Sequence, residues 1–161
     1  MAGMEFSRLG AAVAAVLLVV GYAIGAGVWV SSGRAFYEGL SRPPWQPPDV
    51  VFGLIWPYNF VVLAVAGVVV AVAGSGAARA GWLVLTALSV VAALSWAWLF
   101  YVNESLWPAA VALAIATVLT VPVVVITWRT SIVPGVLLIP YVLWLATATS
   151  LAVGYAVRNP G

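Results

Sequence analysis

Long apolar segments separated by a few charged residues dominate this chain. Five segments carry no charged side chain: residues 9–33, 50–78, 80–103, 105–128 and 130–157. Their apolar residues do not keep to one helical face, unlike those of the amphipathic helices of water-soluble proteins. About 20 apolar residues cross the hydrocarbon core of a bilayer as a helix, so each segment can span it once. The pattern predicts an all-α membrane protein, a bundle of five transmembrane helices.

Turn signals between the segments set the expected ends of the helices. Gly74-Ser75-Gly76, Asn103-Glu104-Ser105 and Arg129-Thr130-Ser131 mark short turns, because Gly, Asn and Ser are frequent in turns. We expect one integral membrane domain over residues 1–161, with helices at about 9–31, 50–73, 81–102, 106–128 and 132–157. A signal peptide is the alternative for the first helix, but its apolar run exceeds the roughly 7–15 residues of a signal core.

The connector between the first two helices is longer than the others and rich in proline. Residues 32–49 contain the run Ser41-Arg42-Pro43-Pro44-Trp45-Gln46-Pro47-Pro48. Proline fixes φ and pushes the residue before it towards extended conformations, so we expect a stiff, structured loop that is not helical. A stiff aromatic loop at the mouth of a membrane bundle indicates a ligand site.

The composition excludes several kinds of chemistry. The chain is 65% hydrophobic, with six basic residues, four acidic residues, and neither cysteine nor histidine. Thiol chemistry and the commonest ligands of metals and haem are therefore absent. No ionisable side chain lies inside the five spans, which argues against ion-coupled transport and against acid–base or nucleophilic catalysis. No basic stripe offers a site for nucleic acid. These absences favour a binding protein over an enzyme, without a metal or a bound cofactor.

Tryptophan is concentrated towards one end of the predicted bundle. Arginines are equally frequent on both sides, so the positive-inside rule gives no orientation. The tryptophans on the side of the long loop are Trp29, Trp45, Trp56, Trp96, Trp98 and Trp107, whereas Trp82 and Trp128 lie at the other end. Interfacial anchoring accounts for part of this set. The excess on one side predicts an aromatic cavity beneath the proline-rich loop, fit for a flat hydrophobic ligand.

Small residues recur at helical spacing in two of the predicted helices. One set is Gly21-x-x-x-Gly25 in the first helix, and the other is Ser89, Ala93 and Ala97 in the third. Such ridges let helix backbones approach closely, within one chain or between two. We expect a homodimer and favour the third-helix ridge as its contact face; packing within one chain is the alternative.

These motifs resemble the tryptophan-rich sensory protein and translocator protein family, TspO, also called the peripheral benzodiazepine receptor family. The matching positions are Phe36-Tyr37, Leu40, Arg42-Pro43, Trp45, Pro47-Pro48, Phe52, Trp56, Trp96, Phe100-Tyr101 and Pro140-Tyr141-Val142-Leu143-Trp144. The chain departs from the family pattern at Ala93 and Ala152, where the family usually has Asn, and at Trp98, where it usually has Pro. Two amides expected in the pocket are therefore missing.

The resemblance implies a five-helix bundle in a bacterial cell membrane, often dimeric, that contacts lipid and binds tetrapyrroles or sterol-like ligands. We expect a receptor or carrier for porphyrin or haem, with a role in transport, sensing or stress regulation. A Trp-dependent photo-oxidative enzyme of porphyrin degradation and a dimeric scaffold with a vestigial pocket are the alternatives. The expected ligand-binding residues are Tyr37, Arg42, Trp45, Phe52, Trp56, Trp96, Phe100, Tyr141 and Trp144.

Three features carry more detailed expectations. Trp56 and Trp144 are expected to bracket a flat ring from neighbouring helices. Arg42 is expected to pair with a ligand carboxylate such as a porphyrin propionate, with lipid headgroups as the alternative. A sterol motif can be matched at Leu151, Tyr155 and Arg158, although an interfacial tyrosine and a snorkelling arginine are the favoured interpretation.

Overall fold

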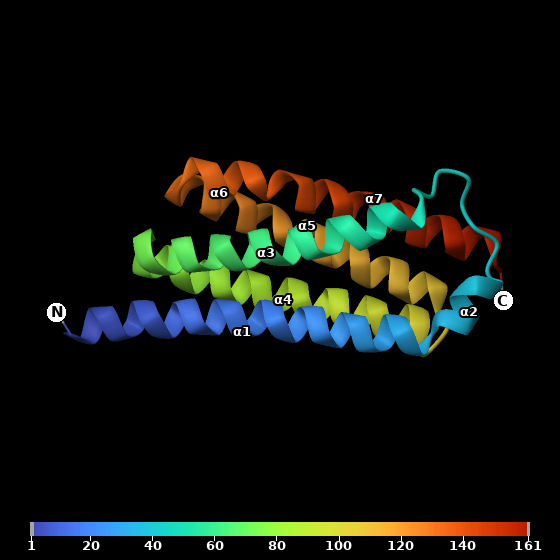
Figure 1. Cartoon of the computed structure of the whole chain (residues 1–161), viewed down its shortest axis with the longest axis horizontal. Helices are drawn as coiled ribbons and strands as arrows, with labels where there is room; N and C mark the ends of the chain where they lie inside the picture. The colour runs from blue at the N-terminus through green and yellow to red at the C-terminus, as the bar shows by residue number, and fades with distance from the viewer. Residues whose placement is uncertain (1, 161) are drawn as a thin grey trace.

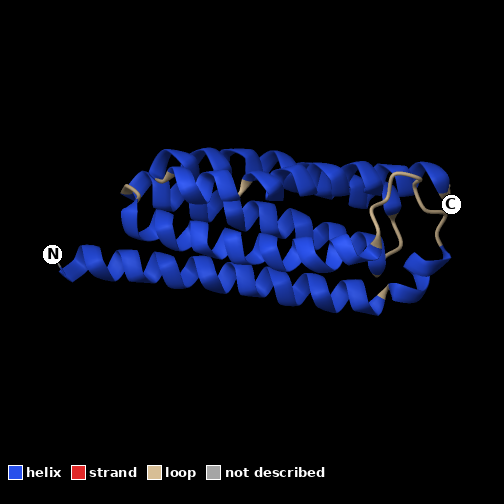
Figure 2. Cartoon of the chain, turned by 45° about the horizontal axis from the view of Figure 1, so that its top comes forward, coloured by secondary structure: helices blue, strands red, loops and turns tan. Residues whose placement is uncertain are grey.

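The computed structural model describes residues 2–160. Its helices are α1 (Ala2–Ser32), α2 (Arg34–Gly39), α3 (Asp49–Ala73), α4 (Gly76–Tyr101), α5 (Leu106–Thr130), α6 (Ile132–Leu137) and α7 (Ile139–Arg158) (Figure 1). Within the described residues all regular structure is helical (Figure 2). The segments long and apolar enough to cross a membrane are Ser7–Ser32, Asp49–Ala73, Gly76–Tyr101, Leu106–Thr130 and Ile132–Arg158. The expected all-α bundle of five transmembrane helices is confirmed, and the protein is an integral membrane protein.

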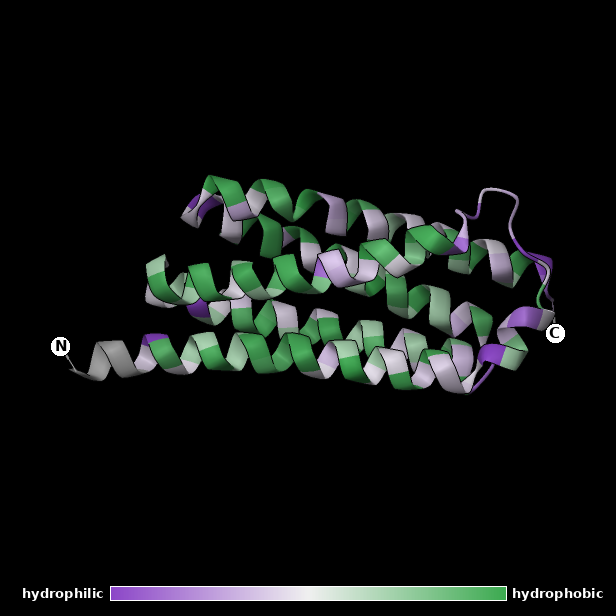
Figure 3. Ribbon diagram, viewed as in Figure 1, coloured by the Kyte–Doolittle hydropathy of each residue, from purple (hydrophilic) through white to green (hydrophobic). Residues whose placement is uncertain are grey.

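The long helices run side by side and place the two ends of the chain at opposite ends of the bundle (Figure 1). Apolar residues lie all round each long helix, while hydrophilic residues gather at the helix ends and in the first connector (Figure 3). This distribution suits a bundle whose outer surface faces lipid. Helix α1 is the least enclosed span, with 17% of its apolar window buried against 33–39% in the others.

The first connector differs from the expected loop because it begins with a short helix, α2. Gly33, between α1 and α2, lies directly against the end of α4, where a Cβ atom would collide with the carbonyl oxygen of Tyr101. Glycine is required at this junction because only a residue without a side chain allows the approach. The part that follows, residues 40–48, contains the prolines and has no helix.

The last predicted helix, 132–157, is divided in two. Helix α6 ends at Leu137 and α7 begins at Ile139. Pro140 has no N–H group to donate to Val136, so the regular helical ladder is interrupted at this point. The Tyr58 hydroxyl of α3 donates to the carbonyl oxygen of Leu137 at 2.9 Å, which satisfies one of the acceptors at the break.

The half of the bundle farther from the proline-rich loop is closely packed around small residues. A Cβ atom on Gly67 of α3 would lie 2.6 Å from the Trp82 ring of α4 and 2.7 Å from the Cβ of Ala15 in α1. The Trp82 indole N–H donates to the Thr127 hydroxyl of α5 at 3.1 Å. One buried tryptophan thus joins three neighbouring helices, and Gly67 makes room for its ring.

The small-residue ridge of α4 lies inside this packing. Ser89, Ala93 and Ala97 are at most 4% exposed. The Ser89 hydroxyl donates to the carbonyl oxygen of Ala116 at 3.1 Å and lies 2.8 Å from the Thr120 hydroxyl. The ridge therefore packs α4 against α5 of the same chain, and the expectation that it forms a dimer contact is wrong.

Candidate functional site

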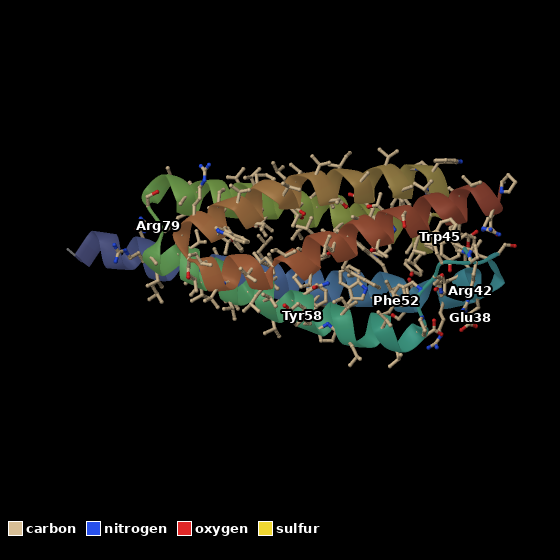
Figure 4. The ribbon with its side chains drawn as sticks, turned by 90° about the horizontal axis from the view of Figure 1, so that it is seen from above. Glu38, Arg42, Trp45, Phe52, Tyr58 and Arg79 are labelled. Carbon is tan, nitrogen blue, oxygen red and sulfur yellow. The ribbon has the colours of Figure 1, made fainter. Side chains whose placement is uncertain are left out.

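A cavity of about 530 Å³ lies at the loop end of the bundle. Its walls come from α1, α3, α4 and α7, and α2 and the proline-rich loop complete it. The volume is within the range of small-molecule sites in proteins. Figure 4 shows Phe52, Arg42 and Glu38 at this end and Arg79 at the opposite end.

Helical periodicity brings the large aromatic residues of the cavity together. On α3, Phe52, Trp56 and Phe60 are four residues apart and therefore share one face. The same spacing joins Trp96 to Phe100 on α4. Small residues on the facing helices leave the space open: Ala23, Ala26, Gly27, Ala148 and Ala152.

Three tryptophans form a continuous aromatic wall. The Trp56 and Trp96 rings are nearly parallel, at 19°, with centroids 6.5 Å apart. Trp144 meets Trp56 edge to face at 6.4 Å and meets Phe52 edge to face at 5.0 Å. Because the Trp56 and Trp144 rings contact each other, the expectation that they bracket a ligand is wrong. Both belong to the aromatic lining of the cavity, with their ring planes nearly perpendicular.

The proline-rich loop is held in place by side-chain hydrogen bonds to α2 and α7. The Gln46 Nε2 donates to the Tyr37 hydroxyl at 2.9 Å, and the Tyr155 hydroxyl donates to the Gln46 Oε1. The Ser41 backbone N–H donates to the Asn159 Oδ1 at 2.8 Å, and the Asn159 Nδ2 donates back to the Ser41 carbonyl at 3.2 Å. The loop is thereby fastened at two points over the cavity.

Trp45 fixes the loop from outside the cavity. A Cβ atom on Gly154 of α7 would lie 2.7 Å from the Trp45 ring and 2.8 Å from Pro43, so both loop residues sit closely on α7 at this glycine. Trp45 does not line the cavity and remains 52% exposed. Trp45 therefore lies outside the cavity that was expected to contain it, and its ring packs the loop against α7.

Two tyrosines of α7 lie in different environments from those expected. Tyr141 is 2% exposed and packs in the core, outside the cavity that was expected to contain it. Tyr155 is 4% exposed and lines the cavity, which corrects its interpretation as an interfacial residue. Leu151 also lines the cavity, and Arg158 is exposed, so the matched sterol motif does not form one lipid-facing surface.

Charged residues form a balanced rim around the mouth of the cavity. Arg34 and Glu38 pair at 3.0 Å, and Arg42 and Asp49 approach to 3.9 Å. The Arg42 guanidinium also lies 5.5 Å from the centroid of the Tyr37 ring. All four charged residues are exposed, so each pair adds little to stability. The rim can meet the polar end of a ligand whose apolar body fills the interior.

The structure thus brings together most of the residues expected from the sequence. Those that line the cavity are Tyr37, Arg42, Phe52, Trp56, Trp96, Phe100 and Trp144. The cavity-lining residues that the sequence analysis missed include Gln46, Phe60, Tyr101 and Tyr155. The four-residue spacing after Trp56 could have indicated Phe60. Of the two positions with a missing amide, Ala152 lines the cavity, whereas Ala93 lies in the core. Among the described residues no acidic, cysteine or histidine cluster could hold a metal ion.

Several known proteins are similar to this chain in sequence. Residues 12–158 match the TspO/MBR family. A tryptophan-rich sensory protein of Cereibacter sphaeroides is 31% identical over 120 residues, which cover 72% of each chain. The tryptophan-rich protein TspO of Bacillus cereus is 27% identical over 74% of this chain and 77% of its own. The human translocator protein is 28% identical over 74% of this chain and 72% of its own. This chain belongs to the TspO/MBR family.

Proposed function

We propose that this protein is a membrane receptor or carrier for tetrapyrroles, and that the ligand lies in the cavity beneath the proline-rich loop. The observation that carries the proposal is the cluster of Trp56, Trp96 and Trp144 in the lining of a 530 Å³ cavity. The names sensory protein and translocator protein, borne by relatives, agree with a receptor or a carrier.

The chemistry of a porphyrin suits this cavity in two respects. Its ring is flat, rigid and apolar on both faces, so it gains most from contact with aromatic side chains. Its propionates are charged and would need solvent or a cation, which the rim offers in Arg34 and Arg42. The cavity interior carries no charged side chain, so the ring is held by apolar contact and the carboxylates are held at the mouth.

A titration of the full chain in lipid nanodiscs with metal-free protoporphyrin tests the proposal. We expect saturable quenching of tryptophan fluorescence at one porphyrin per chain. Because quenching can also come from porphyrin dissolved in the lipid, Ala148→Phe serves as the control, since Ala148 lines the cavity and a phenyl ring there would take space from the ligand. Equal quenching of both proteins, without saturation, would contradict the proposal.

Illumination of the complex separates a receptor or carrier from an enzyme of porphyrin breakdown. The enzyme would use the same tryptophan wall, so binding alone does not distinguish the two. We expect the porphyrin absorption to bleach under light no faster in the complex than in nanodiscs without protein. Faster, protein-dependent conversion to a defined product would favour the enzyme.

A further inference from the structure

We propose that Tyr37, Gln46 and Tyr155 form a hydrogen-bond donor site in the cavity that selects ligands carrying a carboxylate. The inference rests on the proposed function and adds which end of the ligand is recognised. These residues come from α2, the proline-rich loop and α7, and all of them line the cavity. The donor site is thus assembled only in the folded bundle.

The Gln46 amide bridges the two phenols. Its Nε2 lies 2.9 Å from the Tyr37 hydroxyl, and its Oε1 accepts from the Tyr155 hydroxyl. An amide nitrogen can only donate and an amide oxygen can only accept. The bridge therefore uses the hydrogen of one phenol, Tyr155, and the oxygen of the other, Tyr37.

One phenolic hydrogen remains for a ligand. In the observed arrangement it belongs to Tyr37, whose oxygen accepts from Gln46 and also interacts with the Tyr155 hydroxyl. Because the Tyr155 hydrogen is given to Gln46, the Tyr37 hydrogen can meet only the Tyr155 oxygen within the protein, and a carboxylate is a stronger acceptor than that phenol. If the amide were turned round, the remaining hydrogen would belong to Tyr155 instead. Either assignment leaves one phenolic donor at the cavity.

The groups with a contact to Tyr37, the Gln46 amide nitrogen and the Arg42 guanidinium, are donors as well, while the rim carboxylates Glu38 and Asp49 face Arg34 and Arg42. The second hydrogen of the Gln46 amide nitrogen is not used by any hydrogen bond of the described residues. The Arg42 guanidinium lies over the Tyr37 ring, and its contact with Asp49 is long and exposed. The amide oxygen, which could have received a donor from a ligand, is already occupied by Tyr155. A carboxylate, with two oxygens that only accept, fits this set, whereas an amine does not.

Two metal-free porphyrins with the same ring test the inference: protoporphyrin, which carries two carboxylates, and an octaalkyl porphyrin, which carries no oxygen. We expect Tyr37→Phe to weaken protoporphyrin binding about tenfold, the scale of one hydrogen bond to a charged group. Binding of the octaalkyl porphyrin should stay the same. Tyr101→Phe is the matched control, because Tyr101 also lines the cavity and touches the Tyr37 ring but is not part of the bridge.

A second variant, Gln46→Glu, keeps the length of the side chain and replaces the donating nitrogen with an acceptor. It should weaken protoporphyrin binding more than Tyr37→Phe does and again spare the octaalkyl porphyrin. Equal losses for both porphyrins, or no loss for protoporphyrin in either variant, would overturn the donor site while the proposed function stands. Failure of the unmodified protein to bind either porphyrin would overturn the proposed function, and this inference with it.

Discussion

The two halves of the bundle fill the space between the same helices in different ways. In the half away from the loop, Gly67 and Ala15 let helices approach until the Trp82 ring is 1% exposed and its N–H reaches Thr127. In the loop half, the Trp56 ring contacts those of Trp96 and Trp144, and all three line a cavity. Tryptophan is thus a packing residue in one half and a lining residue in the other.

This difference indicates which half stabilises the fold and which half is free to bind. Close-packed interiors lose free energy when volume is added or removed. A cavity wall has already given up contacts on one side, so its residues contribute less to stability than equally large residues in the packed half. Substitutions should therefore separate into those that unfold the bundle and those that change its ligand affinity.

The largest effect expected from this comparison is that of Gly67→Val. The added side chain would meet the Trp82 ring and Ala15, and crowding of this kind costs about 3 kcal/mol of unfolding free energy. Thermal unfolding in detergent measures the loss. Gly53→Val is the matched control on the same helix, because no atom lies within 4 Å of a Cβ atom there. Equal losses of stability in both variants would contradict the proposed close packing around Gly67.

A smaller effect, on binding, is expected from Trp56→Leu. Removing one aromatic platform from the cavity wall should weaken porphyrin binding by about 1–3 kcal/mol, while the unfolding temperature falls less than in Gly67→Val. Trp107→Leu is the control, because Trp107 is 55% exposed on α5 and lies outside the cavity. An unchanged porphyrin affinity in a folded Trp56→Leu protein would show that the wall does not bind the ring.

The smallest effect is expected at the rim. Arg42→Gln removes a cation that is 46% exposed and 3.9 Å from Asp49, so the unfolding free energy should change by less than about 1 kcal/mol. Affinity for free-acid porphyrins should fall about threefold, whereas their dimethyl esters should bind as before. Arg129→Gln is the control, since Arg129 is exposed in the last turn of α5 and lies outside the cavity. Equal losses for acid and ester would mean that Arg42 supports the shape of the loop.

The five spans could be predicted from the sequence because the bilayer imposes a simple requirement on length and charge. The sequence does not predict where a helix breaks inside a span. Pro57 and Pro122 lie inside continuous helices, whereas Pro140 stands at the break between α6 and α7. Contacts with neighbouring helices determine whether a proline interrupts the helix, and the local sequence does not specify those contacts. The prediction of a dimer contact at the α4 ridge was wrong for the same reason, since small residues have the same spacing in contacts within a chain and between chains.

The cavity was partly predictable because aromatic residues recur at helical spacing and match a family pattern. Its polar part was not, because the bridge between Gln46 and Tyr155 joins residues 109 positions apart. Trp45 shows the converse error. Its sequence context favours a ligand contact, but the absence of a side chain at Gly154 creates the surface on which the ring sits.

The hydrogen bonds between Ser41 and Asn159 mean that the first connector can be fixed in place only late in synthesis. These residues are 118 positions apart, and a chain is synthesised from its N-terminus. The first connector therefore leaves the ribosome while four of the five spans are still to be made, and its fastening partner arrives after α7. A nascent chain can insert its early helices, yet it has no closed cavity until Asn159 has emerged. The cavity is therefore completed only after all five spans have been made.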